Sequence, residues 1–286
     1  MQTLQKNWSS ILENLFGGVK SELTVSTPFI SDDGVKFLIE SVSRDFKQKG
    51  FLRIITNLSP RNITQKATNP FSFTKIYEVI NLVQIFHLPN LHAKVYIRDN
   101  KEAIITSGNL TSGGLYKNFE YGISIIEDNV VKEIRNDLTD YGNLGTLLDK
   151  TSIHLLCEKY NHIYDKGKII DGNDVMAIEN NLLQIKFDNV AIEDKAEPIN
   201  AIFAKTIEYI LKKNGPLKVT EIHNYIATIH PDICVEGDRI CNGVNYGSLW
   251  KHKIRTALVT LNKQSKIEHL GGRGGIWQLI NNDYNE

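Results

Sequence analysis

Apolar positions recur with two different periods along the first 150 residues, and the two periods predict two kinds of element. Short apolar runs are typical of buried strands, whereas apolar positions three and four residues apart are typical of helices that cover a sheet. Strands are expected at 22–29, 51–58, 82–86, 91–97, 103–107 and 121–126, and helices at 4–19, 32–46, 72–80 and 129–141. Helices that alternate with apolar strands predict an α/β layer fold.

The pattern changes in the last third of the chain. Helices are expected at 199–214, 220–229 and 248–264, a polar loop at 231–246, and two strands at 266–270 and 276–280 that flank a glycine-rich tip. A helix followed by two strands with such a tip resembles a winged helix. The segment before it is rich in Gly, Asn and Asp and is interpreted as a connector. The expected domains are therefore 1–165, a connector at 166–198, and a small α+β domain at 199–286.

Composition narrows the class of protein without naming its function. Among 286 residues the charges balance at 33 basic and 33 acidic, and 41 % of residues are hydrophobic, as in ordinary globular proteins. No apolar run reaches the roughly 18 residues that a membrane span needs. The first residues lack the basic and then apolar order of a secretory signal, and three cysteines form no disulfide framework, so we expect a cytoplasmic protein.

The candidate chemistry lies between residues 91 and 122. His92 and Lys94 are two residues apart on an expected strand, so both side chains point to one face, while Leu91, Ala93, Val95 and Ile97 point to the other, buried face. An imidazole beside an ammonium group suits nucleophilic attack on a phosphodiester, with the ammonium neutralising the phosphoryl oxygens. Taken alone, the pair would more simply be a solvated strand face.

Three further residues follow at the ends of the next strands. Asn109 can donate its amide to the same phosphoryl oxygens, and Glu120 can bond to Nδ1 of the histidine, which leaves Nε2 free to attack. Ser107 is a supporting hydroxyl in this interpretation. The turn 98–101, Arg-Asp-Asn-Lys, predicts a hairpin between the first two strands.

The pattern His92-x-Lys94-x4-Asp99, then Ser107-x-Asn109, resembles the HxKx4D…GSxN motif of the phospholipase D superfamily. Glu120 matches the acidic residue that follows in its nucleases. Thr106 stands where the family usually has Gly. The resemblance implies a mixed sheet flanked by helices, a phosphohistidine intermediate at His92, phosphate binding by Lys94 and Asn109, and a structural role for Asp99. It implies no metal and no cofactor.

The family's active site uses two such motifs, one histidine forming the phosphohistidine and the other protonating the leaving oxygen. No second His-x-Lys occurs in this chain, since His252 and Lys253 are adjacent. One motif per chain therefore implies a homodimer that builds the site across a twofold axis.

The motif does not choose between lipid and DNA, but the C-terminal region does. Residues 247–273 hold six basic residues and one acidic residue. The helix 248–264 has an apolar stripe and a basic face, as in a recognition helix for double-stranded DNA. The candidate DNA contacts are Lys251, Lys253, Arg255, Lys263 and Arg273. As in most charge runs, these side chains could instead form a plain solvated face.

Together the two resemblances are typical of a metal-independent restriction endonuclease. The alternatives are a catalytically idle, dimeric DNA-binding protein, a lipid-active phosphodiesterase, or a nuclease of repair or toxin type. The recognised sequence and any dependence on base modification stay open.

Overall fold

The computed structural model divides the chain into two compact units, Met1–Ile185 and Lys186–Glu286. It describes residues 1–5, 7–65, 67–164, 172–193, 197–235, 237–241, 244–271 and 275–280. Arg273 lies outside the described residues. The expected connector 166–198 contains a 22-residue helix, α8 (Gly172–Glu193), over most of its described part.

An eight-stranded mixed sheet organises the N-terminal unit, in the order β1-β7-β6-β5-β2-β3-β4-β8. Its strands are β1 (Gln2–Leu4), β2 (Glu22–Ser26), β3 (Phe51–Thr56), β4 (Leu82–His87), β5 (Val95–Arg98), β6 (Glu102–Thr106), β7 (Gly122–Ile125) and β8 (Thr146–Leu147). The strands β2, β3 and β4 are parallel, and the remaining pairs are antiparallel. The expected α/β class with a mixed sheet is confirmed.

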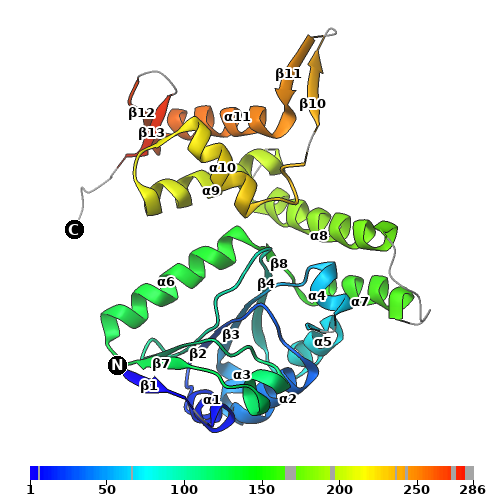
Figure 1. The fold of residues 1–286 in the computed structure, drawn as a ribbon, viewed down its shortest axis with the longest axis vertical. Helices are drawn as coiled ribbons and strands as arrows, with labels where there is room; N and C mark the ends of the chain where they lie inside the picture. The colour runs from blue at the N-terminus through cyan, green and yellow to red at the C-terminus, as the bar shows by residue number, and fades with distance from the viewer. Residues whose placement is uncertain are drawn as a thin grey trace. The chain divides into compact units, whose positions relative to one another are not determined.

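Helices cover both faces of this sheet (Figure 1). They are α1 (Trp8–Gly17), α2 (Asp32–Ser41), α3 (Arg44–Lys49), α4 (Pro60–Thr64), α5 (Pro70–Val79), a π-helical turn η1 (Gly113–Lys117), α6 (Asp128–Leu144) and α7 (Lys150–Tyr164). Successive side chains of the strand β3 point alternately to the two faces of the sheet. Leu52 and Ile54 point into the main core, whereas Arg53 points to α6 and donates a hydrogen bond to Thr139 at 2.7 Å.

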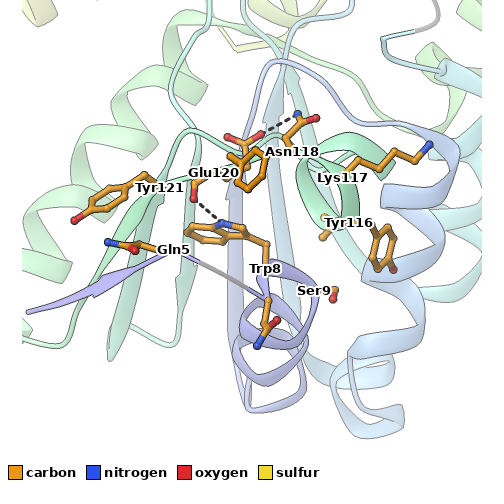
Figure 2. Close-up of a pocket in the computed structure, with 11 residues that line it drawn as sticks. Gln5, Trp8, Ser9, Tyr116, Lys117, Asn118, Glu120 and Tyr121 are labelled. Carbon is orange, nitrogen blue, oxygen red and sulfur yellow. Dashed lines mark hydrogen bonds between the residues drawn. The ribbon is translucent and has the colours of Figure 1, made fainter.

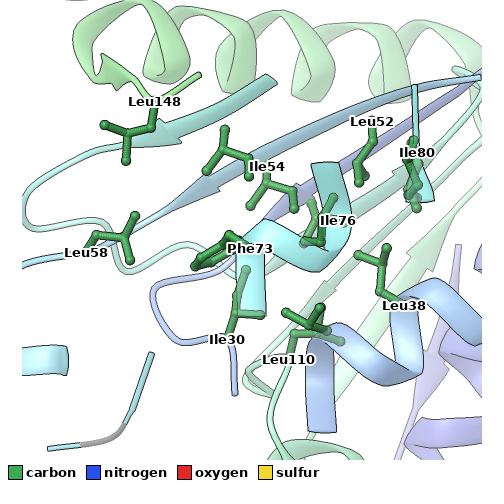
Figure 3. Packing of buried hydrophobic residues seen from close by; sticks show 14 of the residues in the cluster. Ile30, Leu38, Leu52, Ile54, Leu58, Phe73, Ile76, Ile80, Leu110 and Leu148 are labelled. Atoms are coloured by element: carbon green, nitrogen blue, oxygen red, sulfur yellow. The ribbon is translucent and has the colours of Figure 1, made fainter. Parts of the chain in front are cut away.

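The main core lies between the sheet and the helices α1, α2, α5 and α7 (Figure 3). Phe73 and Ile76 of α5 and Leu38 of α2 are fully buried against the strands. Burial of such side chains from water is the dominant favourable contribution to folding. Within the described part of the chain, no helix is long and apolar enough to cross a membrane.

The boundaries differ from the sequence pattern where polar caps or edge pairing override it. The expected helix 32–46 is two helices, because Val42 is extended and the Ser43 side chain accepts a hydrogen bond from Phe46 N that starts α3. The expected helix 4–19 begins only at Trp8, since residues 2–4 form the edge strand β1 against β7.

The hairpin β5–β6 follows the predicted turn, and Asp99 fastens it to the rest of the sheet. Asp99 and Asn100 have positive φ, and Lys101 N donates to Arg98 O at 2.8 Å. The Asp99 carboxylate accepts hydrogen bonds from the backbone N–H groups of Lys20, Ser21 and Glu22 at 2.7 to 2.9 Å. Burial raises the pKa of Asp99, but these hydrogen bonds outweigh it and leave that pKa below its ordinary value.

The C-terminal unit is a small α+β assembly. Its further elements are α9 (Pro198–Asn214), β9 (Leu217–Lys218), α10 (Val219–Ile229), β10 (Asp238–Cys241), β11 (Val244–Ser248), α11 (Leu249–Lys263), β12 (Ile267–His269) and β13 (Ile276–Leu279). The strands β12, β13 and β9 form one sheet and β10 and β11 another. Part of the expected polar loop 231–246 is therefore a β-hairpin.

A buried polar cluster holds the first residues of this unit. Lys186, with 2 % of its surface exposed, donates to His230 Nδ1 at 3.0 Å and to Asp232 at 3.1 Å. His230 Nε2 lies 2.7 Å from the Thr206 hydroxyl. Burial, with a smaller effect of Lys186, holds the pKa of His230 well below its ordinary value. The cluster therefore joins a neutral imidazole to a charged pair inside the unit.

We predict that Asp99→Asn destabilises the N-terminal unit by about 1–2 kcal/mol at neutral pH, because an amide cannot accept all the backbone hydrogen bonds that the carboxylate accepts. The pKa of Asp99 is lowered on folding, so its contribution is complete above the unfolded value of 3.8 and is lost as the pH falls through the folded value. Urea unfolding at pH 7 and at pH 3 measures both effects.

Glu40→Gln is the matched control. Glu40 forms only an exposed pair with Lys36 at 3.9 Å, and such pairs contribute little. The account of Asp99 is wrong if the two variants unfold at the same urea concentration at pH 7, or if the effect of Asp99→Asn grows on acidification.

Candidate active site

His92 and Lys94 lie just before β5, in an extended segment that continues its pairing with β6. Thr106 N donates to Lys94 O at 3.0 Å, so the antiparallel ladder extends back to Lys94. The Lys94 Nζ and His92 Nε2 atoms are 3.5 Å apart, and the predicted shared face is present. The prediction that this segment is strand from residue 91 is wrong, because β5 begins at Val95.

The apolar face of this segment is buried as expected, and the face that bears Lys94 is largely buried as well. Tyr96, on the Lys94 face, is fully buried, and Lys94 itself is only 8 % exposed, whereas His92 is exposed. The strand is central in the sheet, so both of its faces are covered. Burial lowers the pKa of Lys94, and the Glu120 carboxylate raises it by a smaller amount.

The two side chains constrain each other chemically. Lys94 Nζ also donates to the His92 carbonyl at 2.9 Å. A protonated lysine has donors and no acceptor, so it favours the tautomer of His92 in which Nε2 carries a lone pair. Nε2 is then able to act as a nucleophile, and an anion that enters the site would meet a partly dehydrated ammonium group.

Asn109 is oriented by a residue that the sequence pattern does not reveal. Thr27, fully buried after β2, donates its hydroxyl proton to Asn109 Oδ1 at 3.0 Å. Because the carbonyl side of the amide accepts from the protein, the NH2 side remains for a ligand. Gly114 lets the η1 turn close over this residue, since a Cβ there would lie 2.2 Å from Asn109 O. Thr27 precedes Asn109 by 82 residues, so no local motif signals the contact.

Glu120 is held by hydrogen bonds on both carboxylate oxygens. Ser107 donates its hydroxyl proton to one oxygen, and Asn118 donates its amide to the other at 3.0 Å. The backbone carbonyl of Glu120 accepts from the Trp8 indole at 3.1 Å (Figure 2). Within the described residues no hydrogen bond joins Glu120 to His92, so the carboxylate acts on the site here through its charge on Lys94 and its bond to Ser107.

Thr106, which departs from the motif, has a structural role. Its hydroxyl donates to Tyr121 O at 3.2 Å and accepts from Gly108 N at 3.0 Å. These bonds tie the end of β6 to the start of β7. They thereby hold Ser107, Gly108 and Asn109 beside the residues that precede β5.

An open pocket of about 610 Å³ lies beside Glu120. Trp8, Tyr116, Lys117 and Phe119 are among its lining residues, and Figure 2 shows the positions of the first three. Phe119 is fully exposed, and Tyr116 and Tyr121 are more than half exposed. Large exposed aromatic side chains gathered beside a site are typical of a surface that another molecule covers. In the described part of the chain, no group of three or more His, Cys, Asp or Glu side chains is arranged to hold a metal ion.

The basic residues on α11 that are expected to contact DNA differ in their exposure and pairing. On α11, Ile254, Ala257, Leu258 and Leu261 form the buried stripe, and Lys251, Arg255 and Lys263 are exposed. Lys253 instead forms an ion pair with Glu197 at 2.6 Å and is only 21 % exposed. Trp250 is half-buried, and the Lys251 Nζ atom lies 5.3 Å from the centre of its ring.

Part of the N-terminal unit resembles a known protein family. Residues 12–141 match the family described as "Cardiolipin synthase, PLD-like domain". This range holds His92, Lys94, Ser107, Asn109 and Glu120. Residues 12–141 are therefore similar to a phospholipase D-like domain.

Solved structures resemble this PLD-like domain at low sequence identity. They include the phospholipase D family member Nuc from Salmonella typhimurium (17 % identity, TM-score 0.43, 51 % of this chain and 95 % of that one) and NucT from Helicobacter pylori (14 %, 0.38, 49 % and 93 %). The archaeal chromatin protein TrmBL2 matches with 14 % identity, a TM-score of 0.36 and coverage of 50 % and 52 %. These similarities concern the fold alone. No curated protein matches the chain.

We predict that Thr27→Val lowers the kcat/KM for phosphodiester hydrolysis about tenfold, because losing one orienting hydrogen bond weakens transition-state binding by roughly 1.4 kcal/mol. Thr27→Ser keeps the hydroxyl and should retain activity within about threefold of wild type. Hydrolysis of bis(p-nitrophenyl) phosphate, followed beside thermal unfolding, provides the comparison. Wild-type activity in Thr27→Val, or a loss confined to Thr27→Ser, would show that the hydrogen bond to Asn109 does not matter for catalysis.

Proposed function

We propose that the protein is a metal-independent, restriction-type endonuclease that hydrolyses DNA phosphodiesters through a phosphohistidine intermediate. The observation that carries the proposal is the His92–Lys94 pair, 3.5 Å apart beside the oriented amide of Asn109, within a PLD-like domain. An imidazole, an ammonium group and an amide donor supply the nucleophile and the phosphate contacts that the reaction needs.

The reaction proceeds in two displacement steps. His92 Nε2 attacks phosphorus, the bond from phosphorus to the leaving oxygen breaks, and the partner's His92 gives that oxygen a proton. The partner's neutral imidazole then takes a proton from water, water attacks phosphorus, and the bond from phosphorus to Nε2 breaks. Lys94 and Asn109 hold the non-bridging oxygens in both steps. Lys94 and Asn109 from each of the two copies thereby provide the charge stabilisation for which other nucleases use metal ions.

A homodimer supplies the second histidine. The chain has one His-x-Lys pair, and Glu120 stands between the exposed aromatic residues Phe119 and Tyr121. A second copy that covers this surface would remove apolar area from water next to the site. Each chain then contributes His92, Lys94 and Asn109 to one shared centre.

The C-terminal unit selects double-stranded DNA in this proposal. Its order of helix, strand, helix, inserted hairpin, helix and terminal hairpin, with β9 completing the sheet of the terminal hairpin, supports a winged helix. The exposed Lys251, Arg255 and Lys263 place positive charge along α11, which favours contact with phosphates. Arg273, at the tip of the expected wing, remains a candidate contact.

We predict that the purified protein cleaves plasmid DNA in EDTA and that His92→Ala abolishes cleavage while leaving DNA affinity unchanged within about threefold. Removal of the nucleophile typically costs several orders of magnitude in rate. Methylated and unmethylated plasmids are compared side by side on gels, and binding is measured by fluorescence anisotropy.

Discrete fragments from the wild type alone support a site-specific nuclease, whereas smearing supports one without sequence selection. Loss of cleavage in EDTA with rescue by Mg²⁺ would refute the metal-independent mechanism. DNA binding without cleavage would instead favour an idle DNA-binding protein. Hydrolysis of a phosphatidyl substrate, without action on DNA, would favour a lipid-active enzyme.

We predict that an excess of His92→Ala, mixed with wild type under conditions of subunit exchange, suppresses nearly all cleavage. A heterodimer that shares one centre lacks one of its two histidines, so wild-type chains are inactivated by their partners. Mixing without time for exchange is the control. Cleavage that falls only in proportion to dilution of the wild type would indicate independent sites.

We predict that Lys251→Gln weakens DNA binding and lowers the slope of log affinity against log salt by about one unit, as expected for one phosphate contact. Lys253→Gln should change the slope by much less, because Lys253 is already paired with Glu197. Titrations across a range of salt concentrations measure the slopes. Equal slope changes for the two variants would contradict the assignment of the exposed face of α11 to DNA.

A further inference from the structure

The hairpin β10–β11 is an insertion immediately before α11. It forms a two-stranded sheet of its own and pairs with no other described strand. Figure 1 shows it projecting away from the helices α9, α10 and α11 of its unit. Its last residue, Ser248, is the N-cap of α11, so the ribbon leads into the helix without a linker.

The base of the hairpin is fixed to the helix start. Leu249 N donates to Gly237 O at 2.8 Å, and Asp238 pairs with Ser248 across the two strands. The register shifts between Asp238 and Ile240, and an irregularity of this kind increases the local twist of a ribbon. The position of the ribbon relative to the first turn of α11 is therefore set by backbone contacts.

A projecting hairpin of this size has little stability of its own. Two isolated strands are marginally stable in water unless a further strand, a helix or another molecule covers them. The described strands of the unit do not extend this sheet. A ligand that contacts the ribbon would supply the missing packing.

The charges beside the hairpin point to the nature of that ligand. Lys251 and Arg255 are exposed one turn apart at the start of α11, where the helix dipole adds positive potential. Their charges also reach α10, where burial and then these two residues lower the pKa of His223 to about 4. A polyanion is the occupant that this surface favours.

The length of the hairpin β10–β11 fits the major groove of duplex DNA. The major groove admits an α-helix or a two-stranded ribbon. At about 3.3 Å per residue, strands of four and five residues extend roughly 13–17 Å from the helix start, which is enough to reach the floor of a groove about 8.5 Å deep. The N-terminal residues of a recognition helix and the ribbon would then lie in the same groove.

We propose that the hairpin β10–β11 enters the DNA major groove beside the first turn of α11 and is the main base-reading element of the C-terminal unit. Lys251 and Arg255 hold the backbone, and the ribbon determines which sequence is bound. Arg239 is the one cationic residue between 238 and 248, and arginine is the residue that most often reads guanine. This inference rests on the proposed function, because it requires that the unit binds duplex DNA.

The test compares three variants in a His92→Ala background, which prevents cleavage during the assay. The first replaces residues 239–247 by Gly-Gly, which joins the paired residues Asp238 and Ser248 by a two-residue turn. The second is Arg239→Ala, and the third, Lys251→Gln, is the control for backbone contact. Binding to a randomised duplex pool identifies the preferred sequence, and circular dichroism with Trp fluorescence checks folding.

We expect the Gly-Gly variant to bind random duplexes within about threefold of the parent and to lose at least about tenfold of its preference for the selected sequence. Arg239→Ala should relax the preference at one or two positions, and this point variant keeps the test valid if the Gly-Gly variant fails to fold. Lys251→Gln should weaken selected and random duplexes equally.

Four results would overturn the inference. A folded Gly-Gly variant that keeps the parental preference would assign base reading to α11 or to the terminal hairpin instead. If the Gly-Gly variant does not fold, an unchanged preference in Arg239→Ala would likewise assign base reading to α11 or to the terminal hairpin. A parent protein that binds duplexes with no sequence preference would remove the base-reading role while leaving DNA binding intact, and a parent that binds no duplex would overturn the proposed function as well.

Discussion

The register between β5 and β6 is the constraint on which the candidate site depends. Arg98 pairs with Glu102 and Val95 with Ile105, and the ladder continues to the bond from Thr106 N to Lys94 O. A slip of one residue would turn Lys94 to the opposite face of the sheet. The Asp99 carboxylate, in the turn that joins these two strands, accepts hydrogen bonds from three backbone N–H groups at the start of β2 and so fixes the hairpin against β2. The hairpin turn, at the opposite end of β5 from Lys94, thereby helps to set the geometry of the histidine and the lysine.

Burial then gives these side chains their chemical character. Lys94 lies on the same face of the strand as the fully buried Tyr96, and its pKa is lowered mainly by burial. Its neighbour His92 is exposed and can meet a phosphate. A donor that is partly dehydrated before substrate arrives loses less solvation when it binds an anion, and its interaction is stronger in the lower local dielectric. Thr27 adds a fixed amide direction at Asn109.

The sequence predicts the elements that bear strong local signals and misses those set by contacts far along the chain. Spacing places His92 and Lys94 on one face, and the turn residues place the hairpin. Burial of Lys94 depends on helices that cover a central strand, and the Thr27–Asn109 bond joins residues 82 positions apart, so neither follows from a local pattern. The ion pair of Lys253 with Glu197 joins residues 56 positions apart, so the sequence pattern does not reveal that this expected DNA-contact residue has an acidic partner. The sequence pattern predicts a loop where the hairpin β10–β11 lies, because the polar composition of this segment is typical of loops.

The central claim is that His92 is the nucleophile, and trapping the covalent intermediate tests it most directly. The protein is mixed with end-labelled DNA in EDTA, quenched rapidly at alkaline pH, where phosphohistidine survives, and digested for mass spectrometry. The account predicts a DNA phosphate attached to the peptide that contains His92, and no attachment in His92→Ala. Attachment to a different residue, or cleavage with no covalent adduct at any quench time, would contradict it.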